Sequence, residues 1–177
     1  MQRPRHRLLV AVLSVPVLGL GCTSSPDPAL ASATDFTKGF YRWYVPKADK
    51  GMGEQLAIGD SAHLFDSTLV AALRADAEAR AKDSEEVVGL DGDPFLNAQD
   101  FCQAYEVGGA RRDSAHILVD VYGVCDGKKH AAPDVLAELA PRGASWVFVD
   151  FRYPEAHSSL SRTLVELRDS REHAKKR

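Results

Sequence analysis

The sequence lacks an apolar run long enough to cross a bilayer, a surplus of basic residues and a recognisable catalytic motif. A membrane-spanning helix needs about 20 apolar residues, whereas the longest apolar stretch, residues 8–20, has about 13 and is interrupted by Ser, Pro and Gly. The formal net charge is −3, and nucleic-acid binding needs clustered Lys and Arg. We therefore expect no permanent transmembrane helix and no nucleic-acid partner.

Motifs of common enzyme and metal sites are also missing. There is no glycine-rich phosphate loop, no nucleophile elbow and no pairing of Cys with His typical of a thiol enzyme. The spacing of zinc ligands is absent among His63, His116, His130 and His157. The sequence therefore predicts no metal and no cofactor.

What is present at the N-terminus is an export signal. Three arginines precede the apolar stretch 8–20, whose length suits the core of a signal peptide. The stretch ends in Leu-Gly-Cys at Cys22, which resembles the lipobox of bacterial lipoproteins, although Gly19 stands where that motif most often has Leu. The resemblance implies cleavage before Cys22 and lipid on its thiol. The alternative is an ordinary secretory signal cut within residues 29–33.

If Cys22 is lipidated, the first part of the chain divides into two segments. Residues 1–21 are the signal peptide, and residues 22–34, rich in Ser, Pro and Ala, are expected to form a flexible tether because they offer little apolar surface to bury. We expect a lipid anchor in the bacterial cell envelope, facing the periplasm. Thr23 follows the lipidated residue, and by resemblance to the sorting rule of enteric bacteria this favours the outer membrane.

The cysteine count supports the same interpretation. If Cys22 carries lipid, Cys102 and Cys125 remain as a pair in an oxidising compartment. A bridge would close a loop of about 24 residues and stabilise the fold by roughly 3 kcal/mol. Cysteines facing each other in one hairpin require its centre near residues 113–114, whereas the polar stretch 108–114 favours a wide loop centred near 111. The mismatch needs a bulge, or Cys102 lying before the strand.

Helical periodicity dominates the first half of the folded region. Asp35 is the expected N-cap of a helix that ends before Pro46 and carries an aromatic face. Residues 47–59 are expected to be irregular, and a second helix to run from Asp60 or Ser61 to Lys82.

Strand-like periodicity follows a loop at 83–100, in which Asp93 is expected to cap a single turn. The expected strands are 101–107, 115–125 and 145–153, and residues 135–139 suit either helix or strand. A last helix begins at Ser158 or Ser159. Helices followed by strands predict an α+β fold with the helices on one face of an antiparallel sheet, as a single domain over 35–167 with a polar tail at 168–177.

Four ordered segments resemble a bacterial family of small secreted proteins and lipoproteins, domain-of-unknown-function family 3828. They are FYRWYVP (40–46), GLDGDPFLNAQD (89–100), PDVLAEL (133–139) and WVFVDFRYPE (146–155). The resemblance implies the cone-shaped α+β fold, cystatin-like or like nuclear transport factor two and ketosteroid isomerase, with a curved sheet. It also implies a strand at 135–139. It implies no activity, because the family has no established one.

Two groups of polar residues are candidates for chemistry. One is the acidic loop, which could gather oxygen ligands for Ca²⁺ but departs from the EF-hand spacing, so that local capping is favoured: Asp91, Asp93, Asn97 and Asp100. The other is a candidate pocket of strand residues: Asp120, Tyr122, Asp150 and Arg152. Asp120 and Tyr122 are expected on one sheet face, where a general base and an oxyanion donor would be needed. Alternating charges on an exposed strand explain the same residues, and this explanation is favoured.

Three functions are compatible with these patterns. The favoured one is a non-catalytic envelope lipoprotein whose domain binds a protein partner or a small ligand. An isomerase or hydrolase using a concave pocket is the first alternative, by analogy with enzymes of the cone-shaped fold. The second is an immunity-type protein that blocks a toxin in the periplasm, for which the acidic charge of the mature chain would be suitable.

Overall fold

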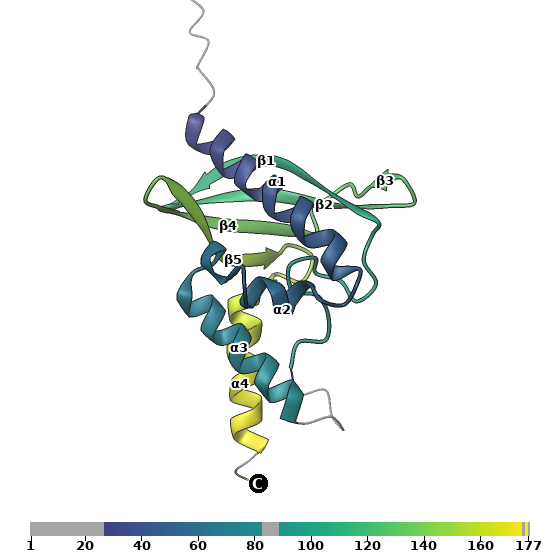
Figure 1. Ribbon diagram of the computed structural model, residues 1–177, viewed down its shortest axis with the longest axis vertical. Helices are drawn as coiled ribbons and strands as arrows, with labels where there is room; N and C mark the ends of the chain where they lie inside the picture. The colour runs from purple at the N-terminus through teal and green to yellow at the C-terminus, as the bar shows by residue number, and fades with distance from the viewer. Residues whose placement is uncertain (1–26, 83–88, 175, 177) are drawn as a thin grey trace, which may run out of the picture.

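The computed structural model describes residues 27–82, 89–174 and 176 (Figure 1). Helices precede an antiparallel sheet and a further helix follows it, which confirms the predicted α+β class. The elements are α1 (Pro28–Ala48), α2 (Gly53–Ile58), the 3-10 helix η1 (Ala62–Leu64), α3 (Ser67–Lys82), β1 (Ala104–Asp113), β2 (His116–Cys125), β3 (Lys128–Lys129), β4 (Val135–Arg142), β5 (Ser145–Tyr153), β6 (Ser158–Ser159) and α4 (Leu160–Ala174). The predicted signal peptide and Cys22 lie outside the described residues.

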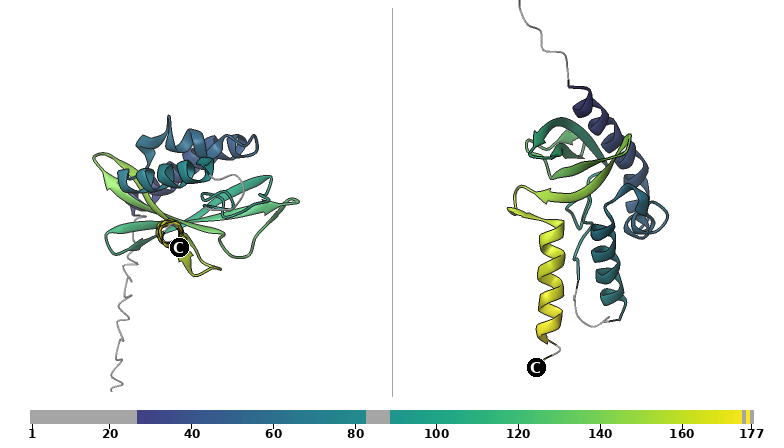
Figure 2. Two further views of the ribbon diagram at one scale, coloured as in Figure 1. Left: turned by 90° about the horizontal axis from the view of Figure 1, so that it is seen from below. Right: turned by 90° about the vertical axis from the view of Figure 1, so that its left-hand side faces the viewer.

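The sheet is open and entirely antiparallel, with strand order β1-β2-β4-β5-β6 and β3 added to β2. Helix α1 crosses one face of the sheet, and α4 leaves the β5–β6 edge to run beside α3 (Figures 1 and 2). The start of α1 and the end of α4 lie at opposite ends of the molecule (Figure 1). Among the described residues, no helix is both long and apolar enough to cross a membrane.

Helix α1 begins at Pro28, and its N-cap Asp27 lies eight residues before the predicted N-cap Asp35. From residue 28 on, the expected flexible tether is therefore helix, and the predicted domain boundary at 35 is wrong. Asp27 is the N-cap: its carboxylate accepts a hydrogen bond of 2.9 Å from the amide of Ala29. Pro28 suits the first helical turn, where its missing N–H is not needed. Ala33 is fully buried. The polar composition was misleading because a few apolar side chains are enough to dock this part of α1: Ala29 and Leu30 pack against the core that includes Ala33.

The same helix also ends later than predicted. Pro46 lies inside α1, and the amide of Asp49 still donates to the carbonyl of Val45 at 3.1 Å. A proline removes one helical hydrogen bond, but here the last turn is retained because Ala48 packs in the core. Residues 47–59, expected to be irregular, contain α2.

Helix α3 begins at Ser67 and not at Asp60 or Ser61. Asp66 precedes it and accepts a hydrogen bond of 2.8 Å from the amide of Thr68. Phe65 interrupts the predicted helix because its backbone is extended and bridges β5, where the amide of Asp66 donates to the carbonyl of Phe148 at 2.8 Å. Burial of the Phe65 ring thus outweighs local helix propensity.

The β1–β2 hairpin turns at residues 114–115, and Ser114 adopts a positive φ of 55°. Strand β1 therefore runs to Asp113, beyond the predicted strand 101–107, and the expected wide loop near 111 is wrong. Gly108 and Gly109 form a bulge within β1, at the register shift between Val107 and Ala110. A Cβ on Gly108 would lie 2.7 Å from the ring of Tyr122, which explains the glycine.

This hairpin brings Cys102 and Cys125 together as a disulfide, with their Cα atoms 4.6 Å apart. Cys102 lies before β1, and Cys125 is the last residue of β2. The sequence left two alternatives for a bridge across one hairpin, a bulge or a cysteine before the strand, and both are present.

The remaining elements match their predictions more closely. Residues 135–139 are a strand, within β4, and β5 has the predicted bounds 145–153.

The predicted polar tail at 168–177 is helical as far as Ala174, the end of α4. Helix α4 is attached to α3 through the buried carboxylate of Asp76, on α3. This carboxylate accepts hydrogen bonds from Arg80 of the same helix at 3.2 Å and from Arg171 of α4 at 2.6 Å.

An aromatic cluster fills the space between α1 and the sheet. The ring of Phe40, on α1, has seven aromatic neighbours at centroid distances of 4.9–6.5 Å: Tyr41, Trp43, Tyr44, Phe65, Phe95, Phe148 and Phe151. Phe40 is 3 % exposed. The aromatic face predicted for the first helix is therefore the centre of the core.

We expect Phe40→Ala to lower the free energy of unfolding by about 3–5 kcal/mol, because it removes buried apolar surface and leaves a cavity. Urea titration followed by tryptophan fluorescence measures this change. The matched control is Val165→Ala on α4, at a side chain that is 45 % exposed, where a change within about 0.5 kcal/mol is expected. Equal effects of the two substitutions would contradict a core centred on Phe40.

Candidate functional site

The sheet has two different faces. On β2, Ile117, Val119 and Val121 belong to the core beneath α1. Because side chains alternate along a strand, the residues between them point to the opposite side. We call this second side the open sheet face, and its charged and polar residues include Arg111, Asp113, His116, Asp120, Tyr122, Glu138, Asp150 and Arg152.

Asp120 and Tyr122 share the open sheet face, as their spacing predicted. The Tyr122 hydroxyl lies 3.5 Å from a carboxylate oxygen of Asp120, and the other oxygen pairs with Arg111 at 2.6 Å. Both residues point away from the aromatic core, so they do not line a pocket between the sheet and α1. The ring of Tyr122 also has the ammonium group of Lys129 at 4.1 Å from its centroid.

Asp150 and Arg152, the other half of the candidate pocket, serve separate interactions. Asp150 accepts hydrogen bonds from the amides of Phe151 and Ser161, at 2.8 and 2.9 Å, and so holds the start of α4. Arg152 pairs with Glu138 and with Asp113, each at 2.7 Å. Leu136 lies between Asp120 and Arg152 in the strand register, so the four candidates are not one cluster.

Glu138 is the central residue of this network, and no sequence pattern distinguishes it from other charged strand residues. Its carboxylate lies 2.6 Å from His116 and 2.7 Å from Arg152. Burial alone would raise the pKa of Glu138, but the hydrogen bonds from Arg152 and His116 outweigh that effect and lower its pKa. Only the register of β2, β4 and β5 aligns these residues, and no sequence pattern specifies that register.

The acidic loop is organised by capping. The carboxylate of Asp93 accepts hydrogen bonds from the amides of Phe95 at 2.9 Å and Leu96 at 3.0 Å, and from the Tyr44 hydroxyl at 2.6 Å. Asp91 accepts instead from the side chain of Gln99 at 2.7 Å. The predicted single turn capped by Asp93 is thus present.

The electrostatics of Asp93 reflect its position. Burial raises the pKa of its carboxyl group from the ordinary 3.8 to about 6, although hydrogen bonds from Tyr44, Phe95 and Leu96 act in the opposite direction. Both carboxylate oxygens are already engaged by groups of the fold. Asp93 therefore joins the loop to α1, and its neighbour Tyr44 is one of the largest fully buried side chains.

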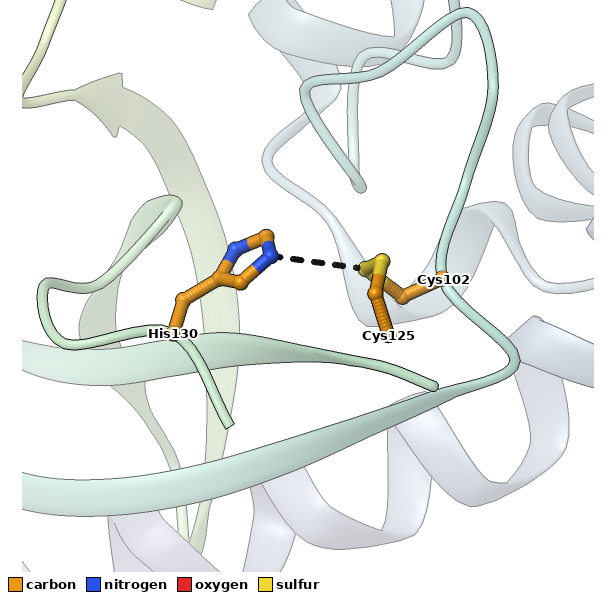
Figure 3. Close-up of side chains that lie close together, drawn as sticks. All are labelled: Cys102, Cys125 and His130. Atoms are coloured by element: carbon orange, nitrogen blue, oxygen red, sulfur yellow. Dashed lines mark hydrogen bonds between the residues drawn. A yellow bond between two sulfur atoms is a disulfide. The ribbon is translucent and has the colours of Figure 1, made fainter. Parts of the chain in front are cut away.

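A histidine lies beside the disulfide, a contact that the sequence did not predict and that differs from the Cys–His pair of a thiol enzyme because the sulfur is already bonded. Nε2 of His130 lies 3.8 Å from Sγ of Cys102, beside the disulfide (Figure 3). Over residues 27–82, 89–174 and 176, the one set of His, Cys, Asp and Glu side chains close enough to hold a metal is Cys102, Cys125 and His130. With the sulfurs joined to each other, neither offers the thiolate that a metal requires. The one sequence feature that could have drawn attention to His130 is Asp134, four residues later, whose carboxylate contacts the histidine ring.

Comparison with known proteins gives no relative: no family model, no curated protein and no solved structure matches this chain. The resemblance to the family of small secreted proteins and lipoproteins therefore stays a prediction.

The raised pKa of Asp93 makes the free energy of unfolding depend on pH in a known direction. Between about pH 4 and pH 6 the folded chain retains a proton on Asp93 that the unfolded chain has released, so the free energy of unfolding falls as pH rises through this window. Asp93→Asn keeps an acceptor for the two loop amides but does not titrate. We expect the stability difference, wild type minus variant, to decrease between pH 4 and pH 6.5.

Urea unfolding of both proteins at several pH values tests this expectation. The difference between the two curves isolates Asp93, because every other titrating group is common to both. A difference that stays constant or increases with pH over this window would contradict the assigned direction.

Proposed function

We propose that this chain is a membrane-anchored lipoprotein of the bacterial cell envelope whose domain binds a protein partner through the open sheet face, without catalysing a reaction. The anchor is supported by the N-terminal pattern: a basic start, a short apolar stretch and a cysteine that ends it. A single lipid chain gives only marginal membrane binding, so stable anchoring needs the multiple acylation that the lipobox resemblance implies.

The observation that carries the binding role is the filling of the helix-covered side of the sheet. The centre of the space between α1 and the sheet, where a concave substrate pocket would lie, is filled by the rings of Phe40, Phe65 and Phe148, which are in contact. An open groove remains on this side between α1 and β1, lined by Tyr41, Val45 and Tyr105 among others. Among the described residues, no buried side-chain nitrogen or oxygen lacks a hydrogen-bond partner. This side of the sheet is therefore suited to stability, and the open sheet face is the surface on which the domain can present chemistry.

The open sheet face has the composition of a recognition surface. Its charges are held in fixed positions by mutual pairing, for example Arg111 with Asp120 and Arg152 with Glu138. Leu118 lies on the same face but is only 4 % exposed, so the accessible surface consists mainly of charged side chains. Fixed charges of both signs favour specificity, because a partner without complementary groups would remove these ion pairs from water without replacing that hydration.

The alternatives make different demands. A small isomerase or hydrolase would have to use Asp120 and Tyr122 on the open side, with Asp120 already paired to Arg111. An immunity-type protein would use the same open sheet face, but its partner would be a secreted toxin and not a resident envelope protein.

Metabolic labelling tests the anchor. Cells that express the full chain are grown with labelled palmitate, and we expect label on the wild type and none on Cys22→Ser. The matched control is the double variant Cys102→Ser and Cys125→Ser, which should retain the label because its lipidation site is intact. Labelling of the Cys22→Ser variant would refute the anchor.

Site-specific photo-crosslinking tests the surface. A photoreactive phenylalanine derivative replaces either Arg111, on the open sheet face, or Arg162, an exposed side chain on α4. In intact cells we expect a discrete crosslinked protein from position 111 alone. A resident envelope protein would support the proposal, and a secreted toxin would favour the immunity alternative.

A charge reversal completes this experiment. Arg111→Glu is expected to reduce recovery of the partner at least tenfold, whereas Arg162→Glu should leave it unchanged. Circular dichroism verifies that both variants are folded. A crosslink from position 162 alone, or equal recovery with both variants, would exclude the open sheet face as the binding surface.

A further inference from the structure

A histidine lies beside the disulfide, and a purely structural crosslink would not need it. Cys102 is buried, whereas Cys125, at the end of β2, is half-buried. His130 lies in the connection between β3 and β4, and its ring reaches back over the sulfurs (Figure 3). Its Nε2 is 3.8 Å from Sγ of Cys102.

A carboxylate holds this ring in one orientation. Nδ1 of His130 lies 2.9 and 3.1 Å from the two carboxylate oxygens of Asp134. Asp134 is itself fixed, because one of those oxygens accepts the amide of Gly123 at 2.6 Å. The backbone is fixed as well: the amides of His130 and Asp134 donate to β2 carbonyls, each at 2.9 Å. Asp134, His130 and Cys102 are therefore connected by successive contacts, and the orientation of the histidine ring between them is fixed.

The consequence for the histidine tautomer is direct. With Nδ1–H donated to Asp134, Nε2 of the neutral ring is the nitrogen without a proton. A sulfur in a disulfide has no proton to give, so this contact is weak in the oxidised protein. After reduction, Cys102 can donate its S–H to Nε2, or remain as a thiolate beside the imidazolium. The His130 interaction therefore favours the reduced state over the oxidised state.

We propose that Cys102–Cys125 is an exchangeable disulfide that reacts with small thiols of the glutathione or dithiol class. Such a thiolate attacks Sγ of Cys125, the more accessible cysteine, and forms a mixed disulfide with it. The Cys125–Cys102 bond breaks, and its electron pair goes to Sγ of Cys102. Nε2 of His130 takes up from solvent the proton that the incoming thiol released and passes it to Sγ of Cys102, which returns the ring to its neutral form.

A second equivalent of thiol completes the reaction. It attacks the external sulfur of the mixed disulfide and releases Cys125 as a thiol. Overall, two thiols are oxidised to one external disulfide, while the protein pair gains two electrons and two protons. Asp134 is a positioning residue in this scheme, because it acts only through the orientation and tautomer of His130.

The test is the equilibrium between the protein and glutathione redox buffers. All proteins are full chains carrying Cys22→Ser, so that thiol trapping and mass spectrometry count only Cys102 and Cys125. His130→Asn keeps an amide donor for Asp134 but removes the atom that faces the sulfur. EDTA is present throughout, so that metal binding to the reduced cysteines does not imitate the effect.

We expect His130→Asn to shift the equilibrium toward the disulfide about tenfold, which for a two-electron couple is about 30 mV. Reduction by dithiothreitol should slow by a similar factor. Asp134→Asn should shift the equilibrium in the same direction by less, and His173→Gln, a remote histidine on α4, should not shift it. An equilibrium unchanged in His130→Asn, or shifted toward the thiols, overturns the proposal.

Two further measurements keep a folding defect from deciding the outcome. Thermal unfolding of the oxidised proteins identifies a destabilised variant, and in that event the same equilibrium with His130→Gln decides by the same criteria. After one equivalent of thiol, the mixed disulfide is expected on Cys125. A mixed disulfide on Cys102 would overturn the assignment of Cys102 as the leaving group.

Discussion

Contact of the Phe40 ring with both the helices and the sheet is the constraint on which the rest of the structure depends. Phe40 belongs to α1, and its aromatic neighbours come from α1 itself, from the segment before α3, from the acidic loop and from β5. Aromatic rings that meet edge to face bury much surface at a defined geometry. One cluster thereby fixes the position of α1, the acidic loop and the sheet relative to one another.

This constraint explains which sequence expectations succeeded. The fold class, β5 and the capped turn at Asp93 could be predicted, because each depends on periodicity or on a local hydrogen bond. The start of α1 could not, although Asp27-Pro28 is a good helix start, because the docking of Ala33 on the core depends on tertiary packing. Phe65 likewise ends a predicted helix because its ring is needed in the cluster.

The candidate residues divide in the same way. Alternation placed Asp120 and Tyr122 correctly on one face, but it does not state which face the helices cover. The partners of Arg152 come from β1 and β4, and the neighbour of Cys102 comes from beyond β3. Such contacts depend on strand order and register, including the bulge at Gly108 and Gly109, which one sequence does not reveal.

The early start of α1 limits how far the domain can extend from its proposed anchor. Asp27 is held at the first turn by Ala29 and by Arg112 of the β1–β2 hairpin. Four residues lie between Cys22 and Asp27, which makes five steps along the chain. A fully extended chain advances about 3.5 Å per step, so the reach is at most about 18 Å. A lipid on Cys22 would therefore hold the domain close to the membrane. The β1–β2 turn would then lie near the lipid headgroups, and the α3–α4 end would face away from the membrane.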